Sequence, residues 1–170
     1  ATVCYSFGND AVDSNYGRSG AITIGNGAVF AYSTKGDPEE GLDCDNDSYI
    51  TITGNGYAIS AGGQQGGGSS SSSLGSAVQG YAVTSSPSSY SSSNYYTLAD
   101  ASGNNLMTYK FEANCTNKHS IVTAKGMVKN SSYTIKYSTT APTDATTAFH
   151  GLYLGSSHKG TTQAASFSAK

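Results

Sequence analysis

The chain has 170 residues and a formal net charge of −2, and only 12% of its residues are Asp, Glu, Lys or Arg. A near-neutral chain of this kind is not expected to bind nucleic acid or an anionic membrane surface, and no apolar segment is long enough to span a bilayer. Gly, Ser and Thr together supply 67 residues, so we expect hydroxyl groups to cover much of the surface. The length fits a single domain, residues 1–170.

The apolar residues are of the kind that strands favour. Tyr occurs 13 times and Trp is absent, while Val, Ile and Thr are each commoner than Leu. Short runs of these residues alternate with turns rich in Gly and Ser. The sequence therefore predicts an all-β domain, namely an antiparallel β-sandwich or jelly-roll-like domain of about ten short strands with long Gly/Ser-rich loops.

Residues 1–7 form the first predicted strand, in which Val3, Tyr5 and Phe7 share one face. A polar, Gly-rich loop follows. An N-terminal strand ahead of such a loop can leave its own domain and complete the sheet of a neighbouring copy, and pairing within its own chain is the alternative. We take Val3, Cys4, Tyr5 and Phe7 as the candidate assembly strand, with Cys4 placed to lock the joint covalently.

Two similar segments follow, and each contains Ile-Thr-Ile and Gly-Asn-Gly. Their first isoleucines, Ile22 and Ile50, are 28 residues apart. Because Asn and Gly tolerate the positive φ of tight turns, each segment predicts a β-hairpin that turns at Gly-Asn-Gly. A solenoid needs at least three copies of its repeat, and the sequence has no third copy, so we expect two hairpins of one sheet system.

Residues 61–76 are of low complexity and predict a long loop within one domain, because a separate domain of some 60 preceding residues would be marginally stable. A second Ser-rich loop covers 85–94. The pair 95–98 and 106–111 predicts a hairpin, and Tyr133, Ile135 and Tyr137 are expected on one buried face. The other predicted strands of this half are 78–84, 120–124, 127–128, 149–154 and 164–168.

The cysteines and sequons point to an extracellular setting. No C-x-x-C motif is present, which excludes a zinc ribbon or a thioredoxin site. Three cysteines in an oxidising compartment predict one disulfide and one remaining thiol, with the pairing open. Sequons add candidate glycosylation sites, and together these features favour a secreted, extracellular or cell-surface protein. The disulfide candidates are Cys4, Cys44 and Cys115, and the glycosylation candidates are Asn46, Asn114 and Asn130.

An acidic segment, residues 37–47, contains six of the eleven acidic residues. Within it Asp43, Asp45 and Asp47 alternate, which is a spacing at which carboxylates bind Ca²⁺. The glycine and the final glutamate of an EF-hand loop are missing, so a solvated acidic loop is the alternative. No cofactor other than this Ca²⁺ is expected.

No catalytic motif is present. The sequence has no G-x-S-x-G, Walker or dinucleotide-binding pattern, and its three histidines are not spaced as a zinc pair. We therefore do not expect an enzyme. Tyr90, Tyr95 and Tyr96 flank a Ser-rich loop and are candidate rings for stacking on sugars, and a place in the core is the alternative.

The charges are distributed unevenly along the chain. Residues 1–109 carry a net charge of −7 and residues 110–170 carry +5, which suits either internal pairing or the complementary ends of a self-associating subunit. We expect a structural subunit of an extracellular filament, pilus-like fibre or surface coat, which assembles with other copies of itself by strand complementation. The alternative is a secreted, lectin-like carbohydrate-binding module that recognises surface glycans, with Ca²⁺ in the acidic segment.

Overall fold

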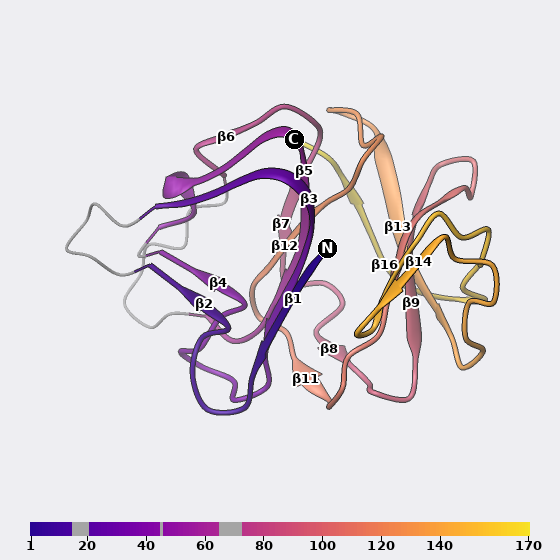
Figure 1. Ribbon diagram of the computed structural model, residues 1–170, viewed down its shortest axis with the longest axis horizontal. Coiled ribbons are helices and arrows are strands. Elements are labelled where there is room, and N and C mark those ends of the chain that lie inside the picture. The colour runs from indigo at the N-terminus through magenta and orange to yellow at the C-terminus, as the bar shows by residue number, and fades with distance from the viewer. Residues whose placement is uncertain (15–20, 45, 65–72) are drawn as a thin grey trace.

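The computed structural model describes residues 1–14, 21–44, 46–64 and 73–170. All regular structure in these ranges is β, apart from one short 3₁₀ turn, η1 (Asp47–Tyr49), so the all-β prediction is confirmed. Two six-stranded sheets form the two sides of the molecule (Figure 1). The described part of the chain has no helix of a length and apolarity that would let it cross a membrane.

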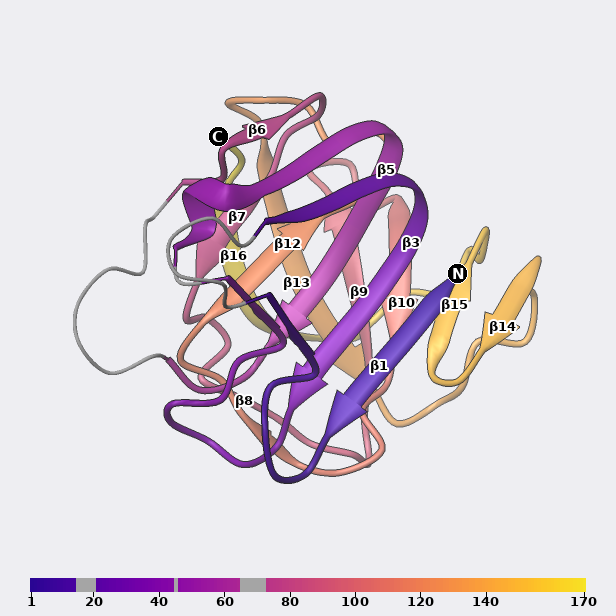
Figure 2. The same cartoon turned by 60° about the vertical axis from the view of Figure 1, so that its left-hand side comes forward.

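The first sheet is mostly parallel, contrary to the antiparallel prediction. Its strand order is β1-β3-β5-β12-β7, and β6 also pairs with β5. The first three strands lie side by side and point the same way (Figure 2). The parallel strands are β1 (Thr2–Ser6), β3 (Ile22–Ser33), β5 (Ile50–Ala61) and β6 (Ser76–Ala77), and the antiparallel ones are β12 (Ser120–Thr123) and β7 (Ala82–Thr84).

The prediction of two hairpins is wrong, because β3 and β5 are each one continuous strand. They pair in parallel with Ile22 opposite Ile50, so the 28-residue spacing is the length of one coil of a short solenoid. Gly-Asn-Gly lies inside each strand, where the register shifts after Ile24. The short strands β2 (Val12–Asp13) and β4 (Leu42–Asp43) also pair in parallel between successive coils. Stacking like residues on neighbouring rungs buries Ile24, Ile50 and Ile52 and covers part of Ile22.

The packing between rungs leaves no room for a side chain at Gly56. A Cβ there would overlap the carbonyl oxygen of Ile24, whereas a Cβ at Gly25 would lie 3.7 Å from Thr53 Oγ1, an ordinary contact. We expect Gly56→Ala to lower the free energy of unfolding by about 1–3 kcal/mol, and Gly25→Ala to change it by less than about 0.5 kcal/mol. Urea unfolding of both variants checks this, and equal losses would contradict the observed stacking.

The second sheet is antiparallel throughout, with strand order β14-β15-β10-β9-β13-β16. The predicted hairpin is confirmed as β9 and β10. Tyr133 and Ile135 are buried as expected, whereas Tyr137 is half-buried. Two further short strands, β8 and β11, pair with each other in a separate two-stranded sheet. The bounds are β8 (Ser89–Tyr90), β9 (Tyr95–Asp100), β10 (Asn105–Tyr109), β11 (Cys115–Thr116), β13 (Ser132–Ser138), β14 (Thr147–Phe149), β15 (Leu152–Leu154) and β16 (Thr162–Ser168).

Three predicted strands have different bounds. The run 149–154 is not one strand, because it contains the end of β14, a two-residue turn and the whole of β15. The turn residues His150 and Gly151 have φ of 44° and 83°, and positive φ at both central residues suits such a turn. Of 78–84 only Ala82–Thr84, which is β7, is a strand. Gly80 precedes it and approaches the backbone of Val128 closely. Residues 127–128 belong to a turn that the Met127 N–H closes on Ala124. Half of the predicted 61–76 loop, residues 65–72, lies outside the described residues.

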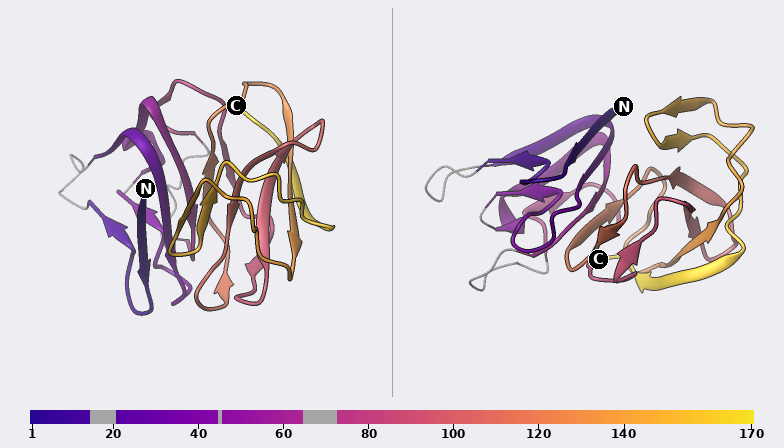
Figure 3. Two further views of the ribbon diagram at one scale, coloured as in Figure 1. Left: turned by 45° about the vertical axis from the view of Figure 1, so that its right-hand side comes forward. Right: turned by 90° about the horizontal axis from the view of Figure 1, so that it is seen from below.

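Aromatic side chains fill the space between the two sheets, which face each other in Figure 3. Phe111 lies at the centre, with ring centroids 4.7 Å from Tyr32 and 4.3 Å from Tyr90. A second cluster lies within the solenoid coils and contains Ile24, Ile50 and Ile52. Residues of both halves of the chain therefore share the core between the sheets.

Candidate functional site

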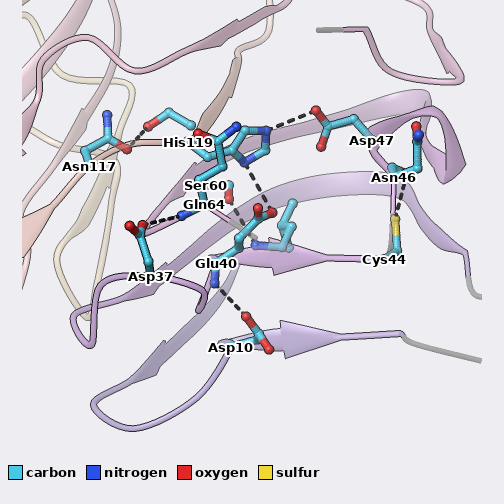
Figure 4. Close-up of polar contacts among 12 residues, drawn as sticks. Asp10, Asp37, Glu40, Cys44, Asn46, Asp47, Ser60, Gln64, Asn117 and His119 are labelled. Atoms are coloured by element: carbon cyan, nitrogen blue, oxygen red, sulfur yellow. Dashed lines mark hydrogen bonds and ion pairs between the residues drawn. The ribbon is translucent and has the colours of Figure 1, made fainter. Parts of the chain in front are cut away.

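Three ionisable side chains meet in the interior of the molecule beside the first sheet, and we call them the acid–histidine cluster. They are Glu40, Asp47 and His119, with relative exposures of 5%, 4% and 4% (Figure 4). Fully buried carboxylates are rare unless they are paired or coordinate a metal, so this cluster is the strongest candidate for a functional site.

Each member comes from a different element. Glu40 lies in the connection just before β4, Asp47 begins η1, and His119 directly precedes β12. The hydrogen bond from the Ser48 N–H to the Asn46 side chain caps η1 and holds Asp47 in place. The fold thus brings residues 72 positions apart into contact.

Two glycines let the connection containing Glu40 approach the strand that ends at Ala61. The Gly62 carbonyl accepts hydrogen bonds from the N–H groups of Lys118 and His119, and the Gly63 N–H donates to Glu39. A Cβ at Gly62 would lie 2.8 Å from the carbonyl oxygen of Glu39, and one at Gly63 would overlap the backbone of Asp37. Glycine at both positions is therefore part of how the cluster is assembled.

The imidazole lies between the two carboxylates. His119 Nε2 is 3.0 Å from Asp47 Oδ2 and forms a hydrogen bond with it. On the other side Nδ1 is 3.3 Å from Glu40 Oε2 but makes no hydrogen bond to any described residue. Burial acts to lower the pKa of His119, but the hydrogen bond to Asp47 and the charges of Glu40, Asp47 and Asp43 outweigh it and raise the pKa. The ring therefore carries a proton more readily than a free histidine.

Further acids support the cluster from outside. Asp10 accepts a hydrogen bond of 2.6 Å from the backbone N–H of Glu40, and burial raises the pKa of Asp10. Asp37 pairs with Lys118 at the surface, and that side-chain hydrogen bond lowers the pKa of Asp37, with help from the Gln64 N–H. These contacts fix both ends of the connection on which Glu40 lies.

The structure does not bring the three predicted Ca²⁺ residues together as one described site. Asp47 belongs to the acid–histidine cluster, Asp43 is buried on β4, and Asp45 lies outside the described residues. Glu40 lies in the acidic segment but was not among the predicted Ca²⁺ ligands, and His119 was not selected at all. The alternating aspartates were the only signal, and nothing in the spacing of His119 connects it with them.

The predicted disulfide is wrong, because none of the three cysteines is joined to another. The Cys44 thiol donates to the carbonyl of Asn46, and the Cys115 thiol donates to the carbonyl of Ser33. Cys44 and Cys115 belong to different hydrophobic clusters, and Cys4 is half-buried at the edge strand β1. Burial raises the pKa of Cys115 to about 12, which makes its thiol unreactive.

Two of the three candidate sugar-stacking rings are in the core. Tyr90 and Tyr96 are 1% and 3% exposed, because β8 and β9 direct them into the aromatic cluster between the sheets. Their prediction as exposed platforms is therefore wrong. Tyr95 is half-buried, packs edge-on against Tyr153 at 5.7 Å and has Lys110 Nζ 5.8 Å from its ring centroid. One partly covered ring is a small surface for a sugar.

The candidate glycosylation sites differ in exposure. Asn114 and Asn130 are exposed, and Asn130 has a φ of 62° in a turn. Asn46 is half-buried, and its side chain caps η1.

A hollow of about 200 Å³ lies beside Asn114 and Tyr90. It is smaller than most small-molecule sites, which have volumes of roughly 300–1,000 Å³.

The candidate assembly strand is β1, and in this structure it pairs with its own chain. Thr2–Ser6 run parallel to the second half of β3, with Val3 opposite Phe30. Val3 and Cys4 are half-buried, whereas Tyr5 is 46% and Phe7 60% exposed. The two exposed rings contact each other edge-on at 5.4 Å.

In comparisons with models of protein families, with curated proteins and with solved structures, this chain matches none of them. The class that the fold defines is an all-β sandwich in which a short parallel solenoid packs against an antiparallel sheet.

Proposed function

We propose that this chain is a structural subunit of an extracellular filament or surface coat, in which a strand of one copy adds to the β1 edge of the next. The observation that carries the proposal is the open edge of the first sheet. Strand addition to such an edge supplies affinity through main-chain hydrogen bonds and specificity through alternate side chains.

The β1 edge lacks the usual protection against pairing. Within the described ranges β1 pairs with β3 alone, so one row of its backbone N–H and C=O groups faces outward. Edge strands are normally protected by charges, proline or a covering segment. The sequence of β1 has no charge and no proline, and Tyr5 and Phe7 add exposed aromatic surface beside it. The opposite edge differs, because Lys170 exchanges backbone hydrogen bonds with Tyr81 just before β7.

The favoured partner edge is β16 of a second copy. It is the last strand of the second sheet, seven residues long, and in the part of the chain described it pairs with β13 alone. The strand lies in the half that carries +5, whereas β1 lies in the half that carries −7. Joining two different edges is a heterologous contact, which repeats into an open filament unless the rotation closes a ring. Few ions need to be desolvated in such a contact.

The test compares two double variants with the same change in charge. Tyr5→Lys with Phe7→Lys places two cations on the proposed edge, and Tyr49→Lys with Val128→Lys places two on exposed sites elsewhere. We expect the native chain and the second variant to form polymers on concentration, seen by negative-stain microscopy and sedimentation. The first variant is expected to stay monomeric with an unchanged circular-dichroism spectrum.

A native chain that sediments as a monomer at millimolar concentration would refute the proposal. Equal polymerisation of both variants would show that the β1 edge is not the contact. If a monomeric native chain binds immobilised glycans, and Tyr95→Ala abolishes that binding, the lectin-like alternative replaces the filament.

A further inference from the structure

We infer that the acid–histidine cluster is a binding site for one first-row divalent metal ion of the zinc type. His119 Nδ1 and Glu40 would supply the protein ligands, and Asp47 would hold the ring through Nε2. The site lies in the interior beside the first sheet, and the inference does not depend on the proposed assembly at β1.

The spacing of the ligand atoms suits a small ion. One ligand atom from each residue lies within 4.8 Å of the other two, and His119 Nδ1 is 3.3 Å from Glu40 Oε2. Tetrahedral zinc with bonds of about 2.0–2.2 Å holds its ligand atoms roughly 3.4 Å apart. The pair formed by Nδ1 and Oε2 therefore already has the separation of two ligands of one ion.

The unsatisfied nitrogen of His119 is a second and independent observation. Nδ1 is fully buried, and it has no hydrogen-bond partner among the residues that the structure places. Buried ring nitrogens almost always form a hydrogen bond, so a nitrogen that approaches Glu40 Oε2 at 3.3 Å without forming one calls for an explanation. Figure 4 shows this nitrogen on the side of the ring that faces Glu40, while the other nitrogen faces Asp47.

The contact with Asp47 is the one that a metal-binding histidine usually makes. When one ring nitrogen coordinates a metal, the other commonly donates its hydrogen to a carboxylate, which fixes the tautomer and the ring orientation. The 3.0 Å hydrogen bond between Nε2 and Asp47 Oδ2 supplies that support. Asp47 therefore holds the ring through Nε2, and Nδ1 is left to coordinate the ion together with Glu40.

The donor set favours zinc over calcium. Imidazole suits Zn²⁺, Co²⁺ and Ni²⁺, whereas Ca²⁺ takes six to eight oxygen ligands in a roomy site. Here two carboxylates and one imidazole lie in a closed interior position. The ion would join the connection before β4 to the start of β12, and the hydrogen bond of Asp47 would add η1, so the ion would act as a structural staple.

The test uses the whole native chain after treatment with a chelator. The protein has only three histidines, so the ring signals of His119, His150 and His158 can be followed together by nuclear magnetic resonance. We expect one equivalent of Zn²⁺ to shift the His119 signals and leave the other two in place. Co²⁺ is expected to give the intense visible bands of a tetrahedral complex. At a free metal concentration 100 times Kd, the unfolding equilibrium constant should fall about a hundredfold.

Matched variants locate the site. Glu40→Gln is expected to abolish the Co²⁺ bands, and His150→Ala, which removes an exposed histidine, should leave them unchanged. If Glu40→Gln fails to fold, the histidine signals of the native chain decide the question. A His119 ring that does not respond to 1 mM Zn²⁺, a response confined to His150 or His158, or Ca²⁺ binding as tight as Zn²⁺ binding would overturn the inference.

Discussion

Replacing His119 by glutamine is expected to lower the free energy of unfolding by about 3–5 kcal/mol at pH 6, measured in chelator-containing buffer. The imidazolium lies between Glu40 and Asp47, at 3.3 and 3.0 Å, and all three side chains are buried. Glutamine keeps much of the volume but removes the positive charge, and this leaves two carboxylates in a place of low dielectric constant. Removing one partner of a buried ion pair costs more than the pair itself contributes.

The same histidine is expected to make the stability depend on pH. Its pKa in the folded chain is raised above the ordinary value of 6.5, so the folded state binds the proton more tightly than the unfolded state does. This contribution is complete below pH 6.5 and is lost as the pH rises through the raised pKa. Urea unfolding of the native chain from pH 6 to pH 9 should therefore show a fall that His119→Gln does not share.

His150→Gln is the control, because His150 is exposed on the hairpin of β14 and β15. We expect that variant to follow the native chain at every pH. A native chain and a His119→Gln variant with parallel pH curves would show that the imidazole does not carry the charge that holds the cluster together.

Truncating Phe111 to alanine is expected to lower the free energy of unfolding by about 3–5 kcal/mol. The ring is fully buried and contacts rings from both sheets, with centroids 5.2 Å from Phe30 on β3 and 6.0 Å from Tyr109 on β10. Its removal leaves a cavity where the sheets meet, and the surrounding rings cannot close it without breaking their own contacts. Denaturant unfolding followed by tyrosine fluorescence measures the loss.

Phe149→Ala serves as the comparison, since Phe149 is 43% exposed at the edge strand β14. We expect it to change the stability by less than about 0.5 kcal/mol. A single, shifted transition for Phe111→Ala is expected if the sheets unfold together. A small loss, similar to that of Phe149→Ala, would contradict the central position of Phe111 between the sheets.

Local sequence was sufficient to predict the structure where residues close together along the chain also lie close together in space. The hairpin of β9 and β10 follows from two β-rich runs around a short polar turn, and the buried face of β13 follows from the alternation of Tyr133 and Ile135. The alternation in β1 likewise indicated a strand. In each case the side-chain period of two and the turn residues carry the information.

The structure of the repeat at Ile22 and Ile50 could not be predicted from local sequence. Ile-Thr-Ile followed by Gly-Asn-Gly is compatible with a hairpin and with a bulged strand in a parallel stack, and both arrangements satisfy the local backbone. Stacking on the neighbouring rung decided between them. It buries Ile24, Ile50 and Ile52, and the backbone of β3 pairs with β1 on one side and with β5 on the other. That choice depends on contacts 28 residues apart, for which the turn residues carry no signal.

By itself, the sequence determined that this protein is built of strands, because Tyr, Val, Ile and Thr in short alternating runs suit pleated surfaces and little else. Only the tertiary structure decided which of those strands are parallel, that Tyr90 and Tyr96 are core rings, and that His119 lies between Glu40 and Asp47. The physical reason is the same in each case. Strand formation is a local property of the chain, whereas burial and the pairing of charges depend on which distant segments the fold brings together.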